Sequence, residues 1–251
     1  MQLTELVSYL DDVLQPTAFK DYAPNGLQVQ GKAEVKKIIT GVTASQRLID
    51  AAVEAGADAI LVHHGWFWKG EDPTITGQKF NRLKPLIDNG ISMLGYHLPM
   101  DAHPTLGNNA GLQAVLGLTH EQFIQPVLDD RGIGQIGTGD YTVASLAAKL
   151  EAELAFKPIV TEPLTDKPLN RIAWCTGGAM SYLQTAIDLG ADAFITGEIN
   201  EPTAHLAQEF GVAYYAAGHH ATERFGPQLI GQHLGEKFDL DVQFIDCPIP
   251  V

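Results

Sequence analysis

The sequence predicts an α/β fold of two similar halves, each built around a mostly parallel β-sheet. The first observation is a regular alternation of short aliphatic runs with helical stretches, which is typical of β-α-β units. The second is that runs such as 59–62 are continuously apolar, which indicates strands buried on both faces of a sheet. The third is that Gly-Ala-Asp-Ala occurs twice, at 56–59 and at 190–193.

The first half begins with a helix predicted over 3–14, because its leucines recur on one helical face. Pro99 argues against a regular helix after the strand that ends at residue 96, so Asp101 is expected in a loop. The other predicted elements are a short strand at 27–29, a strand at 37–42, a helix at 46–55, a strand at 59–62, a helix at 77–89, a strand at 91–96 and a helix at 109–116.

The second half repeats this order of elements. Its Pro-rich stretch 158–168 is typical of a linker or a long loop. The predicted elements are a strand at 123–128, a Gly-rich turn at 132–139, a helix at 143–154, a strand at 171–175, a helix at 182–189, a strand at 193–196, a helix at 202–210, a strand at 212–216, a long helix opened by residues 218–220 and an edge strand at 242–245.

The repeated tetrapeptide indicates an internal duplication. Residues 55–59 match 189–193 at an offset of 134 (190 − 56), and the strands before them match at the same offset. The alternative explanation is that a glycine after a helix and an aliphatic strand are generic features of β-α-β units. Because the match stays in register, we favour a duplication with halves at 1–127 and 128–251. Such halves would face each other across a shared cleft, and the final helix could pack back on the first half.

Composition limits the classes of function. A hydrophobic content of 45% and a charged content of 18% are typical of a globular protein. The net charge of −14 disfavours extended nucleic-acid binding but is compatible with one nucleotide in a metal-lined cleft. Cys175 and Cys247 form no C-x-x-C pair, which favours free thiols in a reducing compartment. Without a membrane-length apolar run or a leader pattern, a cytoplasmic protein that binds no membrane is expected.

Two adjacent histidines end the predicted strand 59–62. Neighbouring side chains in a strand point to opposite faces, but a turn at Gly65 can bring both imidazoles into one cleft. With nine histidines in 251 residues, an adjacent pair also arises by chance. Taken alone, His63 and His64 are therefore weak evidence for a metal site, and an incidental polar pair explains them as well.

Two further strand ends carry a histidine and a carboxylate four residues apart. His219 and Glu223 are expected on one face of a helix, as metal ligands or as a surface ion pair. His97 and Asp101 occupy the corresponding place in the first half, at an offset of 122 (219 − 97). Asp101 could alternatively cap a turn. Three strand ends thus deliver the same types of side chain.

The combination favours a metal centre. Histidine and carboxylate without cysteine suit Zn, Fe, Mn, Co or Ni rather than an iron–sulfur cluster or a closed structural zinc site. Five or six ligands are too many for one open catalytic ion and suit two ions bridged by a carboxylate.

Five strings that span nearly the whole chain carry a resemblance to a known family. They are His63-His64-Gly65, Tyr96-His97-x-x-x-Asp101-x-His103, Gly107-Asn108-Asn109, Thr196-Gly197-Glu198 and Gly218-His219-His220-Ala221-Thr222-Glu223-Arg224. In this combination and order they resemble the GTP cyclohydrolase 1 type 2 homologue (Nif-three-like) family. The resemblance implies two similar α/β halves with a di-metal site between them, assembled as a toroidal homohexamer.

The resemblance also implies roles for individual residues. The metal ligands would be His63, His64, Asp101, His219 and Glu223, with Glu223 bridging two divalent ions. His97 falls where the family keeps a polar residue near the metals, so we expect it to support the ligands or to transfer protons.

Three functions are compatible with this centre. The first is a hydrolase in which metal-activated water attacks C8 of guanine in GTP, or a similar position in another nucleotide or heterocycle. The second is a di-metal phosphoesterase, which the same ligands would support. The third is a non-enzymatic binding or scaffold protein with structural metals. The aromatic cluster 66–68 could stack a base, although such clusters are more often core or interface.

Overall fold

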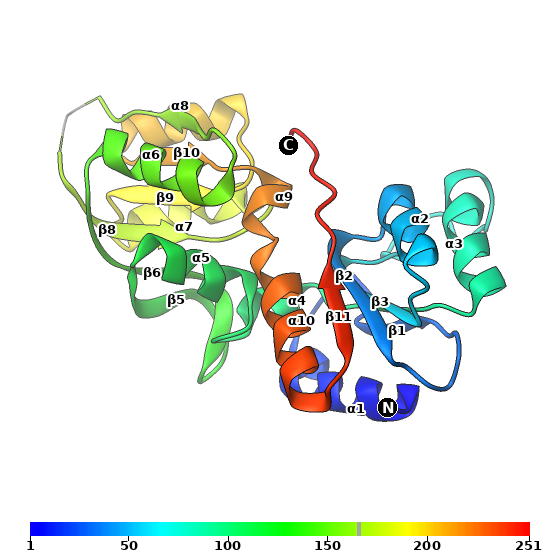
Figure 1. The fold of residues 1–251 in the computed structure, drawn as a ribbon. Helices are drawn as coiled ribbons and strands as arrows, with labels where there is room; N and C mark the ends of the chain where they lie inside the picture. The colour runs from blue at the N-terminus through cyan, green and yellow to red at the C-terminus, as the bar shows by residue number, and fades with distance from the viewer. Residues whose placement is uncertain (165–166) are drawn as a thin grey trace. The chain divides into compact units, whose positions relative to one another are not determined.

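The computed structural model describes residues 1–164 and 167–251. They form two compact units, each with one β-sheet (Figure 1). Unit 1 comprises Met1–Met100 and Gly226–Cys247, and unit 2 comprises Asp101–Phe225 and Pro248–Val251. The α/β class is confirmed, but the chain passes between the units at 100/101, 225/226 and 247/248, which differs from the boundary at 127/128 expected from the repeat. Residues 165 and 166 of the expected loop 158–168 lie outside the described residues.

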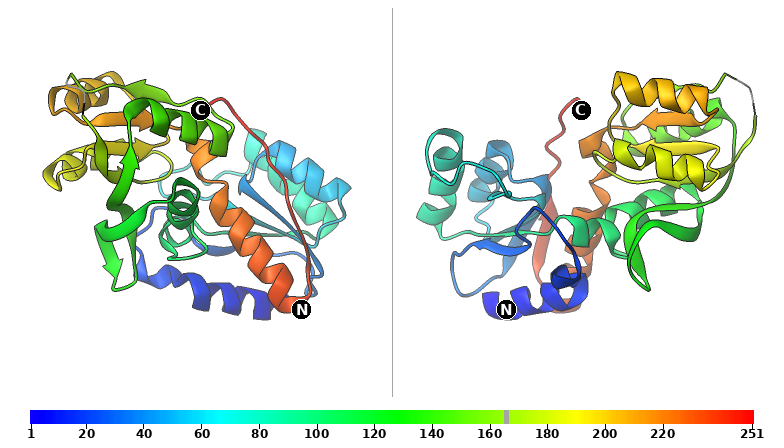
Figure 2. Two further views of the ribbon diagram at one scale, coloured as in Figure 1. Left: turned by 60° about the vertical axis from the view of Figure 1, so that its left-hand side comes forward. Right: turned by 180° about the vertical axis from the view of Figure 1, so that it is seen from behind.

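Unit 1 contains a five-stranded sheet in the order β1-β4-β3-β2-β11. Neighbouring strands are parallel except for β1, which pairs antiparallel with β4. Helices α2 and α3 cover one face of the sheet, and α1 and α10 cover the other (Figures 1 and 2). The elements are α1 (Leu3–Leu14), the 3-10 turn η1 (Pro16–Ala18), β1 (Gly26–Val29), β2 (Lys37–Thr43), α2 (Gln46–Glu54), β3 (Ala59–His64), α3 (Gly77–Asn89), β4 (Ser92–Gly95), α10 (Phe225–Phe238) and β11 (Asp241–Phe244).

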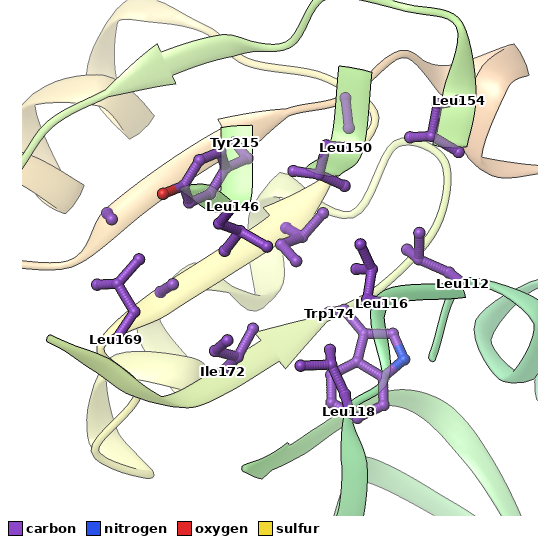
Figure 3. Packing of buried hydrophobic residues seen from close by; sticks show 14 of the residues in the cluster. Leu112, Leu116, Leu118, Leu146, Leu150, Leu154, Leu169, Ile172, Trp174 and Tyr215 are labelled. Atoms are coloured by element: carbon purple, nitrogen blue, oxygen red, sulfur yellow. The ribbon is translucent and has the colours of Figure 1, made fainter. Parts of the chain in front are cut away.

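Unit 2 contains a six-stranded sheet in the order β5-β6-β8-β9-β10-β7. Its parallel strands are β8, β9 and β10, and the outer pairings are antiparallel. Leucines of α5 and α6 pack with Trp174 and Tyr215 on one face, where Figure 3 shows the core. The elements are α5 (Asn108–Leu116), β5 (Thr119–Leu128), β6 (Arg131–Tyr141), α6 (Val143–Leu154), β7 (Ile159–Thr161), β8 (Leu169–Trp174), the 3-10 turn η2 (Met180–Tyr182), α7 (Leu183–Asp188), β9 (Ala193–Thr196), α8 (Glu201–Glu209), β10 (Ala213–Ala216) and α9 (His219–Thr222).

The two units share one topology over most of their length. The order α1-β1-β2-α2-β3-α3-β4 in unit 1 corresponds to α6-β7-β8-α7-β9-α8-β10 in unit 2. In each unit the first strand of this series pairs antiparallel with the last. The second copy therefore starts at α6, and the β5–β6 hairpin precedes it as an addition. After β10 and the short helix α9, the chain returns to unit 1, where it forms the rest of α10 and β11.

An aspartate just before the central strand makes equivalent hydrogen bonds in the two copies. Oδ2 of Asp58 accepts hydrogen bonds from the backbone N–H groups of residues 36 and 37, at 2.9 and 3.1 Å. Oδ2 of Asp192 accepts from residues 170 and 171, at 3.1 and 2.9 Å. The donor positions differ by the same 134 residues as the aspartates, so the register predicted from Gly-Ala-Asp-Ala is present in the hydrogen bonds.

Four local predictions were wrong. Residues 159–161 of the expected linker or loop 158–168 form the edge strand β7, which pairs with β10. Residues 98–102 form the short helix α4, because Pro99 stands in its first turn, where no intrahelical N–H donor is needed. The Gly-rich stretch 132–139 lies within strand β6 rather than in a turn. A Cβ at Gly137 would come within 1.5 Å of the Thr119 carbonyl oxygen, so glycine permits close pairing with β5. The helix after Gly218 is interrupted, since α9 ends at Thr222 and α10 starts at Phe225.

Removing the Asp58 carboxylate should destabilise unit 1 in a pH-dependent way. Burial alone would raise the pKa of Asp58, but its backbone donors and Lys32 outweigh burial and lower that pKa below its ordinary value of 3.8. The stabilisation is therefore present above this ordinary value and is lost as the pH falls below it. We expect Asp58→Ala to lower the free energy of unfolding by about 1–3 kcal/mol at pH 7, measured by urea denaturation.

Asp192→Ala should have a similar effect, because burial is likewise outweighed by its donors and the pKa of Asp192 is lowered. Asp58→Asn keeps one acceptor oxygen and should cost less than Asp58→Ala. A difference from the unsubstituted protein that is as large at pH 3 as at pH 7 would contradict the role of the charge.

Candidate metal centre

Unit 1 gathers three histidines at the carboxyl ends of β3 and β4. His63 and His64 are the last residues of β3, and their ring centroids lie 4.4 Å apart. His97 follows β4, and its ring centroid lies 5.1 Å from that of His63. One ring nitrogen from each of the three lies within 4.8 Å of the others, so this group could hold a metal ion. Parallel strands place their ends at one edge of the sheet, which explains why residues far apart in sequence meet here.

A hydrogen bond at Nδ1 orients each of these rings. His63 Nδ1 lies 3.2 Å from the Tyr96 carbonyl oxygen, and His64 Nδ1 lies 3.1 Å from Thr43 Oγ1. A carbonyl oxygen can only accept, so the bond to Tyr96 requires a proton on Nδ1 of His63. The neutral ring then carries its lone pair on Nε2, the nitrogen that a metal would use. Partners of this kind hold metal-binding histidines in orientation.

His97 makes the strongest such contact. Its Nδ1 lies 2.9 Å from Asp21 Oδ1, and its backbone N–H donates to Asn25 Oδ1 at 2.7 Å. Neither Asp21 nor Asn25 was singled out from the sequence, where Asn25-Gly26 indicated only a turn. No local pattern shows that the loop before β1 reaches the residue after β4, although the antiparallel pairing of these strands brings them together.

The aromatic residues after β3 separate into different environments. Trp66 is part of the core, and its indole N–H donates to the Ala44 carbonyl oxygen at 3.0 Å. Phe67 lies beneath the Lys79 ammonium, 5.5 Å from the ring centroid. Trp68 instead lies against His97, with ring centroids 5.0 Å apart. The expectation of a core position is thus confirmed for Trp66 alone.

Unit 2 holds Asp101 in a buried polar network. Asp101 Oδ1 accepts from Asn108 Nδ2 at 2.9 Å and from Thr176 Oγ1 at 3.3 Å. Asn109 donates to the Asp101 carbonyl oxygen at 3.2 Å and accepts from the Thr176 N–H at 3.1 Å. Asn108 and Asn109, which belong to one of the strings that carry the family resemblance, open α5 and here hold Asp101 in place.

The other predicted ligands of unit 2 form a chain of contacts. His219 Nε2 lies 3.2 Å from Glu223 Oε2, and His219 Nδ1 lies 2.7 Å from Glu198 Oε1. A carboxylate oxygen of Asp101 lies within 4.8 Å of one of Glu223. Glu223 is 2% exposed, which excludes the interpretation of His219 and Glu223 as a surface ion pair. His220, which follows His219, is 6% exposed.

The charges around His219 favour its protonated form when no metal is bound. Burial alone would lower the pKa of His219, but hydrogen bonds and charges of Glu223 and Glu198 outweigh burial and raise that pKa to about 9. The same two carboxylates would favour a divalent cation in place of the proton, because both bring negative charge to one imidazole.

Glycine is required where the loops of unit 2 converge on Glu223. Gly177 has a φ of +71°, and a Cβ there would come within 2.1 Å of Glu223 Oε1. Its N–H donates to Thr222 Oγ1 at 3.0 Å, and its carbonyl oxygen accepts from Thr196 Oγ1 at 2.9 Å. The Gly-Gly turn after β8 therefore makes room for the carboxylate.

The donors of both units fit a divalent transition metal. Imidazole and carboxylate groups are ligands that zinc, iron, manganese, cobalt and nickel accept. Burial and the negative charges of Asp101 and Glu223 raise the pKa of the nearby Cys175 thiol. Along residues 1–164 and 167–251, no helix is long and apolar enough to cross a membrane.

Comparisons with known proteins point to one family. The family model of Duf34/NIF3 (NGG1p interacting factor 3) matches residues 1–249. The chain is 51% identical, over 254 residues and 100% of both chains, to an Escherichia coli (strain K12) protein named GTP cyclohydrolase 1 type 2 homolog.

Solved structures show the same fold. One, described as "Structural genomics, protein ybgI, unknown function", has a TM-score of 0.95 and 50% identity, with 100% of both chains covered. TTHA1606 from Thermus thermophilus has a TM-score of 0.89 and 32% identity, again with 100% of both chains covered. Sequence and structure together establish that this chain belongs to the Duf34/NIF3 family.

Proposed function

We propose that the chain is a di-metal-dependent hydrolase that acts on a nucleotide or a similar heterocycle, with GTP as the first substrate to test. The observation that carries the proposal is the pair of histidines that ends strand β3, His63 and His64, with ring centroids 4.4 Å apart and with His97 beside them. The family relatives named GTP cyclohydrolase 1 type 2 homolog support the choice of substrate class.

The proposed ligands are His63, His64, Asp101, His219 and Glu223, with Glu223 bridging two divalent ions. Each has a partner that limits its rotation, such as Asn108 for Asp101 and Glu198 for His219. Rigid ligands of this kind keep the coordination geometry open to substrate. The bound ions would supply Lewis acidity and water activation.

His97 is the proposed group for proton transfer. It is 7% exposed and lies against His63, so it is placed beside the proposed ligands without being one of the residues that the family resemblance assigns to the ions. A ring with a fixed orientation can take a proton from water and return it to the departing nitrogen. A buried position keeps bulk solvent from competing for that proton.

Metal binding can be tested without any assay of activity. We expect metal-stripped protein to bind two Zn²⁺ or Mn²⁺ ions per chain, measured by titration calorimetry and elemental analysis. Glu223→Gln should reduce the occupancy of both ions, because it removes charge from the bridging carboxylate. Glu201→Gln is the matched control, since Glu201 lies 4.0 Å from His205 in an exposed i,i+4 pair. Equal metal content in the two variants would contradict the assignment of Glu223.

Activity can be tested with the metal-loaded protein and GTP. We expect ring opening with release of formate, and a kcat lowered about 10²–10⁴-fold in His97→Gln with metal content unchanged. His205→Gln serves as the control. The absence of formate with Fe, Mn, Zn and Ni would contradict the GTP version.

Two other outcomes would favour the alternative functions. Phosphate release from nucleotides, lost in Asp101→Ala, would indicate a phosphoesterase. A loss of thermal stability on chelation, without any turnover to lose, would indicate structural metals.

We further propose a cytoplasmic homohexamer. Large apolar side chains are exposed on both units, among them Tyr22 at 56% and Phe210 at 57%, and burial between copies would remove such surface from water. Light scattering after size exclusion should give six times the 27.1 kDa of one chain. A monomeric mass would refute the assembly.

A further inference from the structure

Asp21 takes no part in the chemistry proposed above, and its carboxylate is surrounded by hydrogen-bond donors. Its side chain is 2% exposed. Oδ1 faces His97 Nδ1 at 2.9 Å and accepts from the Ala23 N–H at 3.1 Å. Oδ2 accepts from Asn25 Nδ2 at 3.1 Å and from the Leu98 N–H at 3.0 Å. Each carboxylate oxygen therefore has two hydrogen-bond contacts.

The orientation of the Asn25 amide is fixed by a second contact. Its Oδ1 accepts the His97 backbone N–H at 2.7 Å, so the amide nitrogen must be the atom that faces Asp21. Flipping the amide would place an NH₂ group against an N–H group. Asn25 thus acts as a donor to Asp21 regardless of how the histidine is protonated.

These contacts determine which nitrogen of His97 carries the proton. Three donors that do not depend on the histidine face the carboxylate of Asp21, namely the Ala23 N–H, Asn25 Nδ2 and the Leu98 N–H, and they favour its ionised form. An ionised carboxylate can only accept, so Nδ1 of His97 must donate to it. In the neutral ring the lone pair then lies on Nε2.

Two aromatic rings hold the imidazole in place. The ring centroids of Tyr22 and Trp68 lie 5.1 and 5.0 Å from that of His97, both edge-on. Tyr22 and Trp68 also contact each other, at 5.3 Å. The imidazole is therefore restrained by the carboxylate at one nitrogen and by ring contacts around it.

We propose that Asp21 is the positioning residue for His97: it holds the ring in the Nδ1–H tautomer and so makes Nε2 the atom that accepts a proton in the reaction. The kinetic part of this inference rests on the proposed function. The tautomer itself does not, because it follows from contacts within unit 1.

The variant Asp21→Asn should reverse the tautomer, and a count of donors shows why. If the new NH₂ group took the place of Oδ2, it would face two donors, Asn25 Nδ2 and the Leu98 N–H. If it took the place of Oδ1, it would face only one obligate donor, the Ala23 N–H, because His97 Nδ1 can give up its proton and accept. The second arrangement has fewer donor–donor contacts, so His97 is expected to move its proton to Nε2.

Neutron diffraction of the deuterated protein at pH 8 tests the inference directly. In the unsubstituted protein we expect deuterium on His97 Nδ1, directed at Asp21. In Asp21→Asn we expect deuterium on Nε2 and none on Nδ1. An Nδ1 without deuterium in the unsubstituted protein would overturn the proposal. This measurement decides the matter even if Asp21→Asn does not fold.

The kinetic consequence separates positioning from general stability. With GTP turnover established, Asp21→Asn should lower kcat about 10²–10⁴-fold, leave metal content unchanged and change KM little. Asp58→Asn removes a charge from another backbone-bonded aspartate of unit 1 and should leave kcat unchanged. An equal loss of kcat in both variants would overturn the positioning role. Absence of GTP turnover in the unsubstituted protein would count against the proposed function alone, and the neutron result would still stand.

Discussion

Parallel pairing of three consecutive strands is the constraint on which both units depend. In unit 1 the pairing of β2, β3 and β4, and in unit 2 that of β8, β9 and β10, brings the carboxyl ends of the strands to one edge of the sheet. The middle of each of these strands is mostly apolar and buried. The polar side chains of the candidate centre therefore lie at the strand ends or just beyond them, so those of one unit meet there without any special local sequence.

Within each cluster, backbone and side-chain donors decide which atoms can bind a ligand. Asp101 is held through Oδ1 by Asn108 and Thr176, and Glu223 fits only because residue 177 is a glycine. The same principle applies to His63, whose Nδ1 is used by a carbonyl oxygen. These hydrogen bonds therefore restrain Asp101 and His63 before any metal binds. This arrangement reduces the entropy that a ligand side chain would lose when a metal binds.

The sequence was sufficient for the class of fold and for most elements of each copy, because these follow from periodicity and from the repeated Gly-Ala-Asp-Ala. The candidate ligands rest on the residue pattern and on family resemblance, and they stay a prediction. The sequence failed where the outcome depends on pairing between distant segments. The Gly-rich stretch of β6 forms a strand only because β5 lies close beside it. The residues around Asp21 and Glu198 in the sequence do not show which histidine each one contacts. Asp21 precedes β1 but contacts His97 after β4, and Glu198 follows β9 but contacts His219 after β10.

Both copies place a carboxylate oxygen beside Nδ1 of a histidine, but the carboxylate comes from different parts of the chain. His97 follows β4 and His219 follows the corresponding strand β10, and both have a carboxylate oxygen within 3 Å of Nδ1, at 2.9 and 2.7 Å. In unit 1 the carboxylate comes from the loop before β1, whereas in unit 2 Glu198 comes from the turn after β9, at the position that His64 occupies in the first copy. A carboxylate beside Nδ1 is thus retained while its source in the chain has changed. This indicates that orientation of the imidazole, rather than any one residue position, is what both copies preserve.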